Sequence, residues 1–147
     1  MVRHHRELVG KEWPVLPEDE AWARRRKQYC AWLANGSGFI LIARAEGSDV
    51  PVGYAACQLL PPGPTFDLGD LRGDVDSLVT AEAARGRGVG TALLNACRDE
   101  LRRRGARYWL IGVVESNAQA VDLYQRLGFR PFVRTMLAAI DGSAEAR

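Results

Sequence analysis

The spacing of apolar positions changes along the chain, and each change predicts a different element of secondary structure. Residues 17–20 (Pro-Glu-Asp-Glu) are typical of a helix start, because acidic side chains complement the positive end of the helix dipole. The helix is expected to end at Asn35-Gly36, with apolar residues at helical spacing: Trp22, Tyr29, Trp32 and Leu33. At this spacing the two tryptophans are expected to be core residues.

The middle of the chain has the pattern of paired strands. Residues 39–43 form an apolar run typical of a buried strand, and residues 50–60 predict its partner across a turn at 46–49. This order predicts an antiparallel hairpin. The Pro-Pro-Gly-Pro sequence at 61–64 then interrupts regular structure. The stretch from there to Gly73 is expected to be either a mobile loop beside a binding site or a structural crossover.

Helices and strands alternate in the second half. A strand over 75–80 precedes a helix with one apolar face, formed by Val89, Leu93, Cys97 and Leu101, which Gly105 is expected to end. Strands are predicted at 107–114 and 133–140. This order indicates a layered α/β fold. With 147 residues the chain has the length of a single domain spanning 1–147, long enough to bury a real core.

Composition narrows the class of protein without identifying it. Apolar residues make up 47% and charged residues 26%, as in ordinary globular proteins. A net charge of +2 is too small to indicate nucleic acid or a membrane surface, and the short basic runs at 24–27 and 102–104 are interpreted as solvated helix faces. No apolar run reaches membrane-spanning length, and the first residues lack the apolar core of a signal peptide. We therefore expect a cytoplasmic location.

The cysteines and histidines offer no pattern of metal ligands. Cys30, Cys57 and Cys97 are odd in number, far apart and set in apolar surroundings, so we interpret them as reduced packing residues. His4 and His5 lie near the terminus, where a disordered end is the simplest expectation. No metal site is predicted.

The most informative segment is a glycine-rich turn between the strand at 75–80 and the helix that follows. Alternating glycines allow a sharp bend and close approach of a ligand, and the free N–H groups of the next helix would face the turn. Such a geometry binds phosphate. The spacing fails both G-x-x-x-x-G-K-[ST] and G-x-G-x-x-G. It fits R-x-x-G-x-G, filled by Arg85, Gly88 and Gly90.

A second pattern, N-x-x-A-x-x-L-Y-x-x-x-G-F, covers residues 117–129. Asn117 suits a helix N-cap, Gly128 a left-handed C-cap, and Phe129 can fold back on the last turn. One side of this helix is apolar: Ala120, Leu123, Tyr124 and Leu127. Alone it would be an ordinary capped amphipathic helix. With the glycine turn upstream, residues 78–129 resemble the GNAT (Gcn5-related N-acetyltransferase) superfamily, whereas the N-terminal part matches no motif.

The resemblance implies a single-domain layered α/β fold. Its central sheet is mixed and mostly antiparallel, with helices on both faces and a cofactor cleft between two splayed parallel strands. It implies an enzyme that moves an acetyl group from acetyl-CoA to a primary amine of a small molecule or peptide, by direct attack in a ternary complex. A longer acyl donor is a variant, and a non-catalytic coenzyme A-binding sensor or scaffold is the alternative. A nucleotide- or nucleic-acid-binding module is opposed by the loop spacing and the low charge.

The resemblance also assigns roles to residues of the cofactor site. Backbone N–H groups of the strand are expected to bind the oxyanion and the pantetheine arm, the glycine turn the pyrophosphate, and Asn117 the pantetheine arm. The expected cofactor-binding residues are Leu78, Val79, Thr80, Arg85, Gly86, Arg87, Gly88, Val89, Gly90, Thr91 and Asn117. Thr80 stands where valine is more usual, and strand packing is the favoured interpretation of its side chain.

The resemblance marks Tyr124 as the general acid, since a phenol can return a proton to the departing thiolate. The alternative is a core tyrosine with a tethered hydroxyl. For the general base, Asp76 ranks first, because alternation along a strand would put it on the same face as Leu78 and Thr80. Asp74, Glu115 and water remain open, and for each of the three carboxylates taken singly, solvation at a strand end is the favoured alternative. Homodimerisation is a family-level expectation, which exposed apolar residues on the last predicted strand would support.

Overall fold

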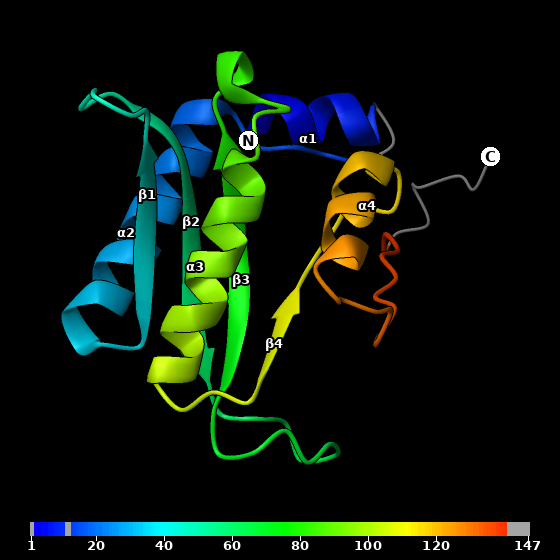
Figure 1. Cartoon of the computed structure of the whole chain (residues 1–147). Helices are drawn as coiled ribbons and strands as arrows, with labels where there is room; N and C mark the ends of the chain where they lie inside the picture. The colour runs from blue at the N-terminus through cyan, green and yellow to red at the C-terminus, as the bar shows by residue number, and fades with distance from the viewer. Residues whose placement is uncertain (1, 11–12, 141–147) are drawn as a thin grey trace. The chain divides into compact units, whose positions relative to one another are not determined.

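The computed structural model describes residues 2–10 and 13–140 (Figure 1). The chain divides into two compact units. The larger one is formed by residues 17–112, and the smaller one combines described residues of 1–16 and 113–147. The prediction of one domain over the whole chain stays a prediction, and the two units are described separately.

The larger unit contains a four-stranded mixed sheet in the order β1-β2-β3-β4. β1, β2 and β3 pair antiparallel, whereas β3 and β4 pair parallel. Its elements are α2 (Glu18–Asn35), β1 (Gly38–Arg44), β2 (Pro51–Leu60), β3 (Arg72–Thr80), the 3₁₀ turn η1 (Glu82–Ala84), α3 (Val89–Arg103) and β4 (Tyr108–Ile111). The predicted fold class is thereby confirmed, including the hairpin and the strand that enters the glycine turn.

Helices α2 and α3 cover opposite faces of this sheet (Figure 1). On one face, Tyr29 and Trp32 of α2 pack with Ala56 in the core. On the other, a Cβ added to Gly53 would lie 3.1 Å from Val89 and 3.3 Å from Leu93, both of α3. Residues 53 and 56 differ by an odd number, so the period of two along β2 places them on opposite faces.

A β-bulge interrupts the pairing of β2 with β3. Ala56 is opposite Ser77, but the next residue, Cys57, is opposite Val75, so Asp76 is an extra residue in β3. A bulge changes the alternation of side chains along its strand. The prediction that Asp76 shares a face with Leu78 and Thr80 is therefore wrong: its carboxylate is directed towards α2, 3.1 Å from the Tyr29 hydroxyl.

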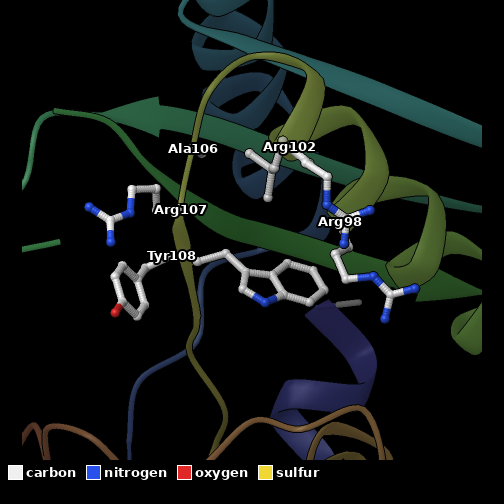
Figure 2. A pocket seen from close by; sticks show the side chains of 7 residues that line it. Arg98, Arg102, Ala106, Arg107 and Tyr108 are labelled. Carbon is white, nitrogen blue, oxygen red and sulfur yellow. The ribbon is translucent and has the colours of Figure 1, made fainter. Parts of the chain in front are cut away.

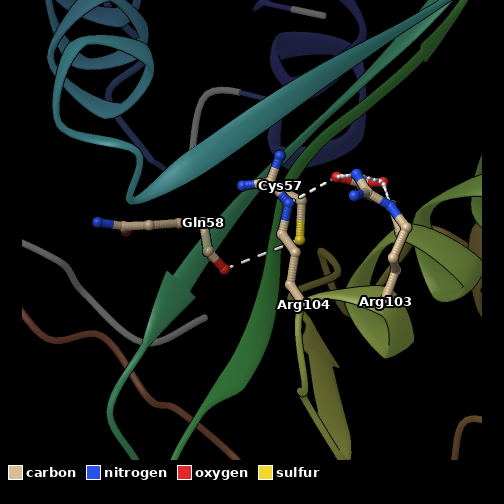
Figure 3. Close-up of polar contacts among 5 residues, drawn as sticks. Cys57, Gln58, Arg103 and Arg104 are labelled. Atoms are coloured by element: carbon tan, nitrogen blue, oxygen red, sulfur yellow. Dashed lines mark hydrogen bonds and ion pairs between the residues drawn. The ribbon is translucent and has the colours of Figure 1, made fainter.

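The end of α3 is fixed by side chains and by a left-handed glycine. Gly105 has φ of 86°, and its N–H donates to the Arg102 carbonyl at 3.0 Å, as expected for this cap. The Glu100 carboxylate accepts from Arg103 and Arg104 (Figure 3). These bonds, Arg103 first, lower the pKa of Glu100. Arg104 also lies over the Phe39 ring, 5.0 Å from its centroid, so this part of the basic run supports packing.

The smaller unit contains α1 (Val2–Val9) and α4 (Ala118–Arg126). The Ser116 hydroxyl donates to the Leu8 carbonyl at 3.0 Å and ties the two segments together. His4 and His5 lie on α1, so the expectation of a disordered end is wrong for them.

The strand predicted at 133–140 is not formed: residues 130–139 have no regular structure. An apolar pattern indicates a strand only where a neighbour takes up its backbone N–H and C=O groups. The other predicted strand of this half, 107–114, is shortened to β4, because its pairing with β3 ends at Val75↔Ile111.

Two core predictions, for Trp22 and Cys30, are also corrected. Burial on α2 is confined to Tyr29 and Trp32, so Trp22 and Leu33 are 56% and 55% exposed. Cys30 is exposed as well, whereas Cys57 and Cys97 are buried free thiols. The Cys57 thiol, within the sheet, is placed to donate to the Gln58 carbonyl (Figure 3). Within the described residues we find no helix with the length and apolar character needed to cross a membrane.

Candidate functional site

The site begins where β3 separates from β4. Their parallel pairing runs only from Arg72↔Tyr108 to Val75↔Ile111, whereas β3 continues to Thr80. The N–H of Ala81, just after β3, donates to the Val52 carbonyl at 2.8 Å and so points towards β2. Because N–H directions alternate along a strand, Val79 also points towards β2, and the N–H groups of Leu78 and Thr80 face the opposite edge. That edge has no ladder partner among the described residues.

The glycine turn follows directly from this edge. Gly86 and Gly88 have φ of 72° and 80°, which explains why glycine recurs there. A Cβ built on either residue would meet nothing within 4 Å, so the turn is open on its outer side. Gly90 falls inside the first turn of α3.

The first turn of α3 is left with unpaired donors. Gly88 is its N-cap, no side chain caps the helix, and no acidic residue lies in the first turn. The N–H groups of the first residues therefore have no intrahelical acceptor and stand at the positive end of the dipole. Arg85 and Arg87 next to them are exposed and form no ion pair within the described part of the chain. The arrangement suits an anionic group such as phosphate.

The larger unit thus places ten of the predicted cofactor-binding residues at the end of β3, in the glycine turn and at the start of α3, although the N–H of Val79 points towards β2 and not to the open edge. They are Leu78, Val79, Thr80, Arg85, Gly86, Arg87, Gly88, Val89, Gly90 and Thr91. Figure 1 shows β3 leading through the turn into α3.

Asp76 lies in a polar cluster that the sequence did not indicate. Its Oδ2 accepts from the Ser77 hydroxyl at 2.8 Å and lies 3.1 Å from the Tyr29 hydroxyl. Tyr29 also bonds Ser77 at 2.7 Å, and Arg25 Nε stands 3.9 Å from the same carboxylate oxygen. Burial raises the pKa of Tyr29 above its ordinary value. Tyr29 and Arg25 lie 47 or more residues before Asp76 and Ser77 in the chain, so no local motif could have revealed these contacts.

The other two candidates for the general base are engaged elsewhere. Asp74, the first of these, pairs with Arg72 at 3.1 Å. Glu115 belongs to the smaller unit, where its side chain is 88% exposed and lies 3.4 Å from Arg134. It follows β4 by several residues and does not end a strand.

The second pattern has the predicted local geometry. The Asn117 side chain accepts from the Ala120 N–H at 3.2 Å, so it caps α4. Gly128 has φ of 92°, and the Phe129 N–H donates to the Tyr124 carbonyl at 3.0 Å. These bonds form the predicted left-handed C-cap of α4.

Tyr124 is half-buried on α4, and its ring stands edge-on to Phe129 with 5.8 Å between centroids. Burial raises the pKa of its hydroxyl, which stays protonated at neutral pH. Within the described residues this hydroxyl forms no hydrogen bond. The alternative of a tethered core tyrosine is therefore not supported.

A cavity of about 500 Å³ lies elsewhere in the larger unit, between the end of α3 and β4 (Figure 2). Its lining residues are Arg98, Leu101, Arg102, Ala106, Arg107, Tyr108 and Trp109. It contains neither a carboxylate nor any of the predicted site residues. Its arginines could have been noticed in the sequence from the i, i+4 spacing of Arg98 and Arg102, but that spacing is common on solvated helices.

A layered α/β fold with an open strand edge, followed by a helix whose N-terminus suits an anion, is typical of proteins that bind phosphate-containing cofactors. Within that class, the chain belongs to the Acetyltransferase (GNAT) family, whose model matches residues 3–129. The resemblance recognised in the sequence is thereby confirmed.

Curated relatives are similar over most of this chain. It is 32% identical to a mycothiol acetyltransferase of Saccharomonospora viridis, over 80% of this chain and 38% of that protein. It is 31% identical to an uncharacterised N-acetyltransferase of Methanocaldococcus jannaschii, over 74% of this chain and 45% of that protein. The chain therefore spans less than half the length of these two relatives.

Solved structures share the fold. A mutant of a Bacillus halodurans protein aligns with a TM-score of 0.76 and 20% identity, covering 94% of this chain and 85% of that one. The acetyltransferase AAC(6')-Iy, solved with a bisubstrate analogue of coenzyme A, aligns with a TM-score of 0.68 and 22% identity, covering 94% and 90%. At these identities the likeness concerns the fold.

Proposed function

We propose that this chain carries the catalytic domain of an N-acetyltransferase that moves an acetyl group from acetyl-CoA to a primary amine, by direct attack in a ternary complex. The observation that carries the proposal is the continuity between an open β3 edge and an uncapped α3 start. The β3 edge offers N–H groups to the thioester carbonyl and to the extended, amide-containing pantetheine arm. The start of α3 offers N–H groups to the pyrophosphate.

The residues present fit coenzyme A at this place. The open space outside Gly86 and Gly88 leaves room for phosphate oxygens to reach the backbone, and no carboxylate lies in the first turn to repel them. Arg85 and Arg87 supply positive charge, and a guanidinium matches phosphate geometry well. Asn117 is assigned to the pantetheine arm by family resemblance, with its cap role alongside.

In the proposed reaction a neutral amine attacks the thioester carbonyl, a C–N bond forms and the C–S bond breaks. The N–H groups of Leu78 and Thr80 stabilise the negative charge that develops on the carbonyl oxygen. Asp76 takes a proton from the amine, directly or through water. Tyr124 gives its proton to the departing thiolate.

The acceptor is proposed to be a small-molecule amine, with a peptide amine as the other possibility. The similarity to a protein named for mycothiol, a small molecule, supports the first. Cytoplasmic location and homodimerisation also stay predictions. The exposed apolar side chains of Val133, Met136 and Leu137 are consistent with association, which sedimentation velocity would measure.

The decisive experiment is a calorimetric titration of the purified protein with acetyl-CoA, using NAD and ATP as controls. We expect selective binding of acetyl-CoA and its loss in Gly88→Asp, because the new carboxylate would occupy the open side of the turn and repel phosphate. Gly47→Asp is the matched control: Gly47 also has positive φ, at 71°, with nothing within 4 Å, but it lies in the β1–β2 turn.

The outcomes separate the candidate functions. Binding followed by thiol release with an amine supports the enzyme. Selective binding without release across an amine panel would favour the coenzyme A-binding sensor. A folded protein that does not bind acetyl-CoA would refute both.

A further inference from the structure

We propose that Tyr29 and Ser77 are positioning residues that fix the Asp76 carboxylate for the amine, so that helix α2 sets the geometry of the general base. The inference rests on the proposed function. Neither the family motifs nor the sequence around Asp76 indicates this positioning by α2.

Asp76 lies at the point of the sheet where β3 and β4 separate. Val75 is the last residue of β3 paired with β4, and Asp76 is the bulged residue that follows it. The bulge therefore puts a carboxylate at the point where the strands separate. Leu78 lies two residues further along β3, so its Cα is about 7 Å from that of Asp76 at the usual rise of a strand. This separation suits a carboxylate that acts on an amine next to the oxyanion donors, with one water between them.

The lengths of the contacts among Tyr29, Ser77 and Asp76 indicate the direction of their hydrogen bonds. The Tyr29 hydroxyl has one proton, and its shorter contact is to Ser77 Oγ, at 2.7 Å against 3.1 Å to Asp76 Oδ2. Ser77 Oγ in turn lies 2.8 Å from Oδ2. The lengths favour a relay in which Tyr29 donates to Ser77 and Ser77 donates to Asp76.

The Tyr29 hydroxyl, the Ser77 hydroxyl and the Arg25 guanidinium all lie near the same oxygen of the Asp76 carboxylate, Oδ2. Arg25 Nε is a further group near Oδ2, at 3.9 Å, and it is buried without a hydrogen-bond partner in the described part of the chain. Within those residues Oδ1 of Asp76 accepts no hydrogen bond. The carboxylate is thus held by Oδ2, and Oδ1 is left to accept the amine proton through the intervening water.

The two residues that carry the hydroxyls are more deeply buried than the carboxylate. Tyr29 and Ser77 are 5% and 2% exposed, whereas the Asp76 side chain is 28% exposed. The donors are locked by packing, and the acceptor stands at the border of solvent. A general base needs a carboxylate that substrate can reach and that buried neighbours hold in one orientation. Tyr29 and Ser77 meet the second requirement, and the partial exposure of Asp76 meets the first.

The test compares Tyr29→Phe and Ser77→Ala with the wild type, and Tyr54→Phe is the matched control. Tyr54 is half-buried against the same core cluster, and no hydrogen bond holds its hydroxyl within the described residues. We expect kcat to fall about tenfold in the two test variants, as part of a base's contribution is lost. The KM for acetyl-CoA should stay within twofold, and Tyr54→Phe should match the wild type.

A second readout does not depend on activity. Three-bond couplings measured by NMR should report one χ1 rotamer for Asp76 in the wild type and in Tyr54→Phe, and averaged rotamers in Tyr29→Phe and Ser77→Ala. An averaged Asp76 in the wild type, or an unchanged kcat and rotamer in Tyr29→Phe, would overturn the inference. Failure of the wild type to bind acetyl-CoA would instead overturn the proposed function, and the coupling data would still decide whether the positioning exists.

Discussion

Two tyrosines of this chain show how a hydroxyl acquires a role. Tyr29 and Tyr124 both have a pKa raised by burial, so both are protonated at neutral pH. The Tyr29 hydroxyl lies 2.7 Å from Ser77 Oγ, to which it donates, and 3.1 Å from Asp76 Oδ2, so it acts as a structural donor. Tyr124 forms no such bond among the described residues, and its proton remains available for transfer.

Replacing Tyr124 by Phe is expected to lower turnover by at least about tenfold, because the variant lacks the proton donor proposed for the departing thiolate. Affinity for acetyl-CoA should change little, since the phenol is not assigned to binding. Thiol release gives the rate and calorimetry gives the affinity. Tyr108→Phe, which removes a half-exposed hydroxyl outside the proposed site, serves as the control. A Tyr124→Phe enzyme with the wild-type rate would exclude Tyr124 as the acid.

At the scale of elements, glycines decide how closely the strands and α3 approach. A Cβ on Gly53 would lie 2.7 Å from the Val79 carbonyl oxygen, a backbone atom that cannot move alone. The same Cβ would press on Val89 and Leu93 of α3. The packing of α3 near the glycine turn therefore requires a glycine at position 53 of β2.

Gly53→Ala is accordingly expected to lower the free energy of unfolding by about 1–3 kcal/mol, the usual cost of overpacking. Gly63→Ala is the control, because its Cβ would meet nothing within 4 Å and its φ is not positive. That change should be neutral or slightly stabilising. Urea unfolding followed by circular dichroism measures both, and equal midpoints for the two variants would contradict the packing argument.

At the scale of the whole molecule, the cysteines report how the chain is buried. Cys57 and Cys97 are completely buried, and burial raises the pKa of each to about 12. Cys30 is exposed on α2. Because the thiolate is the reactive form, the folded protein should hide two of its three thiols from reagents.

At pH 8 we expect a chromogenic disulfide reagent to titrate one thiol rapidly, and three in denaturing urea. The raised pKa values also have a consequence for stability, since the unfolded thiols ionise near 9.0 and the folded ones near 12. The contribution of these two protonated thiols to the free energy of unfolding is therefore complete below pH 9 and is lost as the pH rises towards 12. Rapid reaction of all three thiols in the folded protein would contradict this account. So would a loss of stability between pH 9 and pH 12 that is the same in the wild type and in a variant carrying both Cys57→Ala and Cys97→Ala.

Local signals in the sequence were sufficient for features that depend on neighbouring residues. The start and end of α2, the hairpin, the glycine turn and both caps of α4 were predicted, because capping bonds and positive φ angles involve residues only a few positions apart. The family motifs lie in the same local segments, so the chain's membership of the Acetyltransferase (GNAT) family could also be recognised from the sequence.

Features that depend on distant partners were decided by the tertiary structure. The bulge that turns Asp76 towards α2 comes from the register between β2 and β3, and the Tyr29 and Arg25 side chains that face it lie on a helix 47 or more residues away. The exposure of Trp22 and Cys30 depends on which turns of α2 meet the sheet. The absence of a strand at 133–140 follows from its lack of a pairing partner within the described residues. Periodicity specifies which side of an element is apolar, but only the assembled sheet determines what that side contacts.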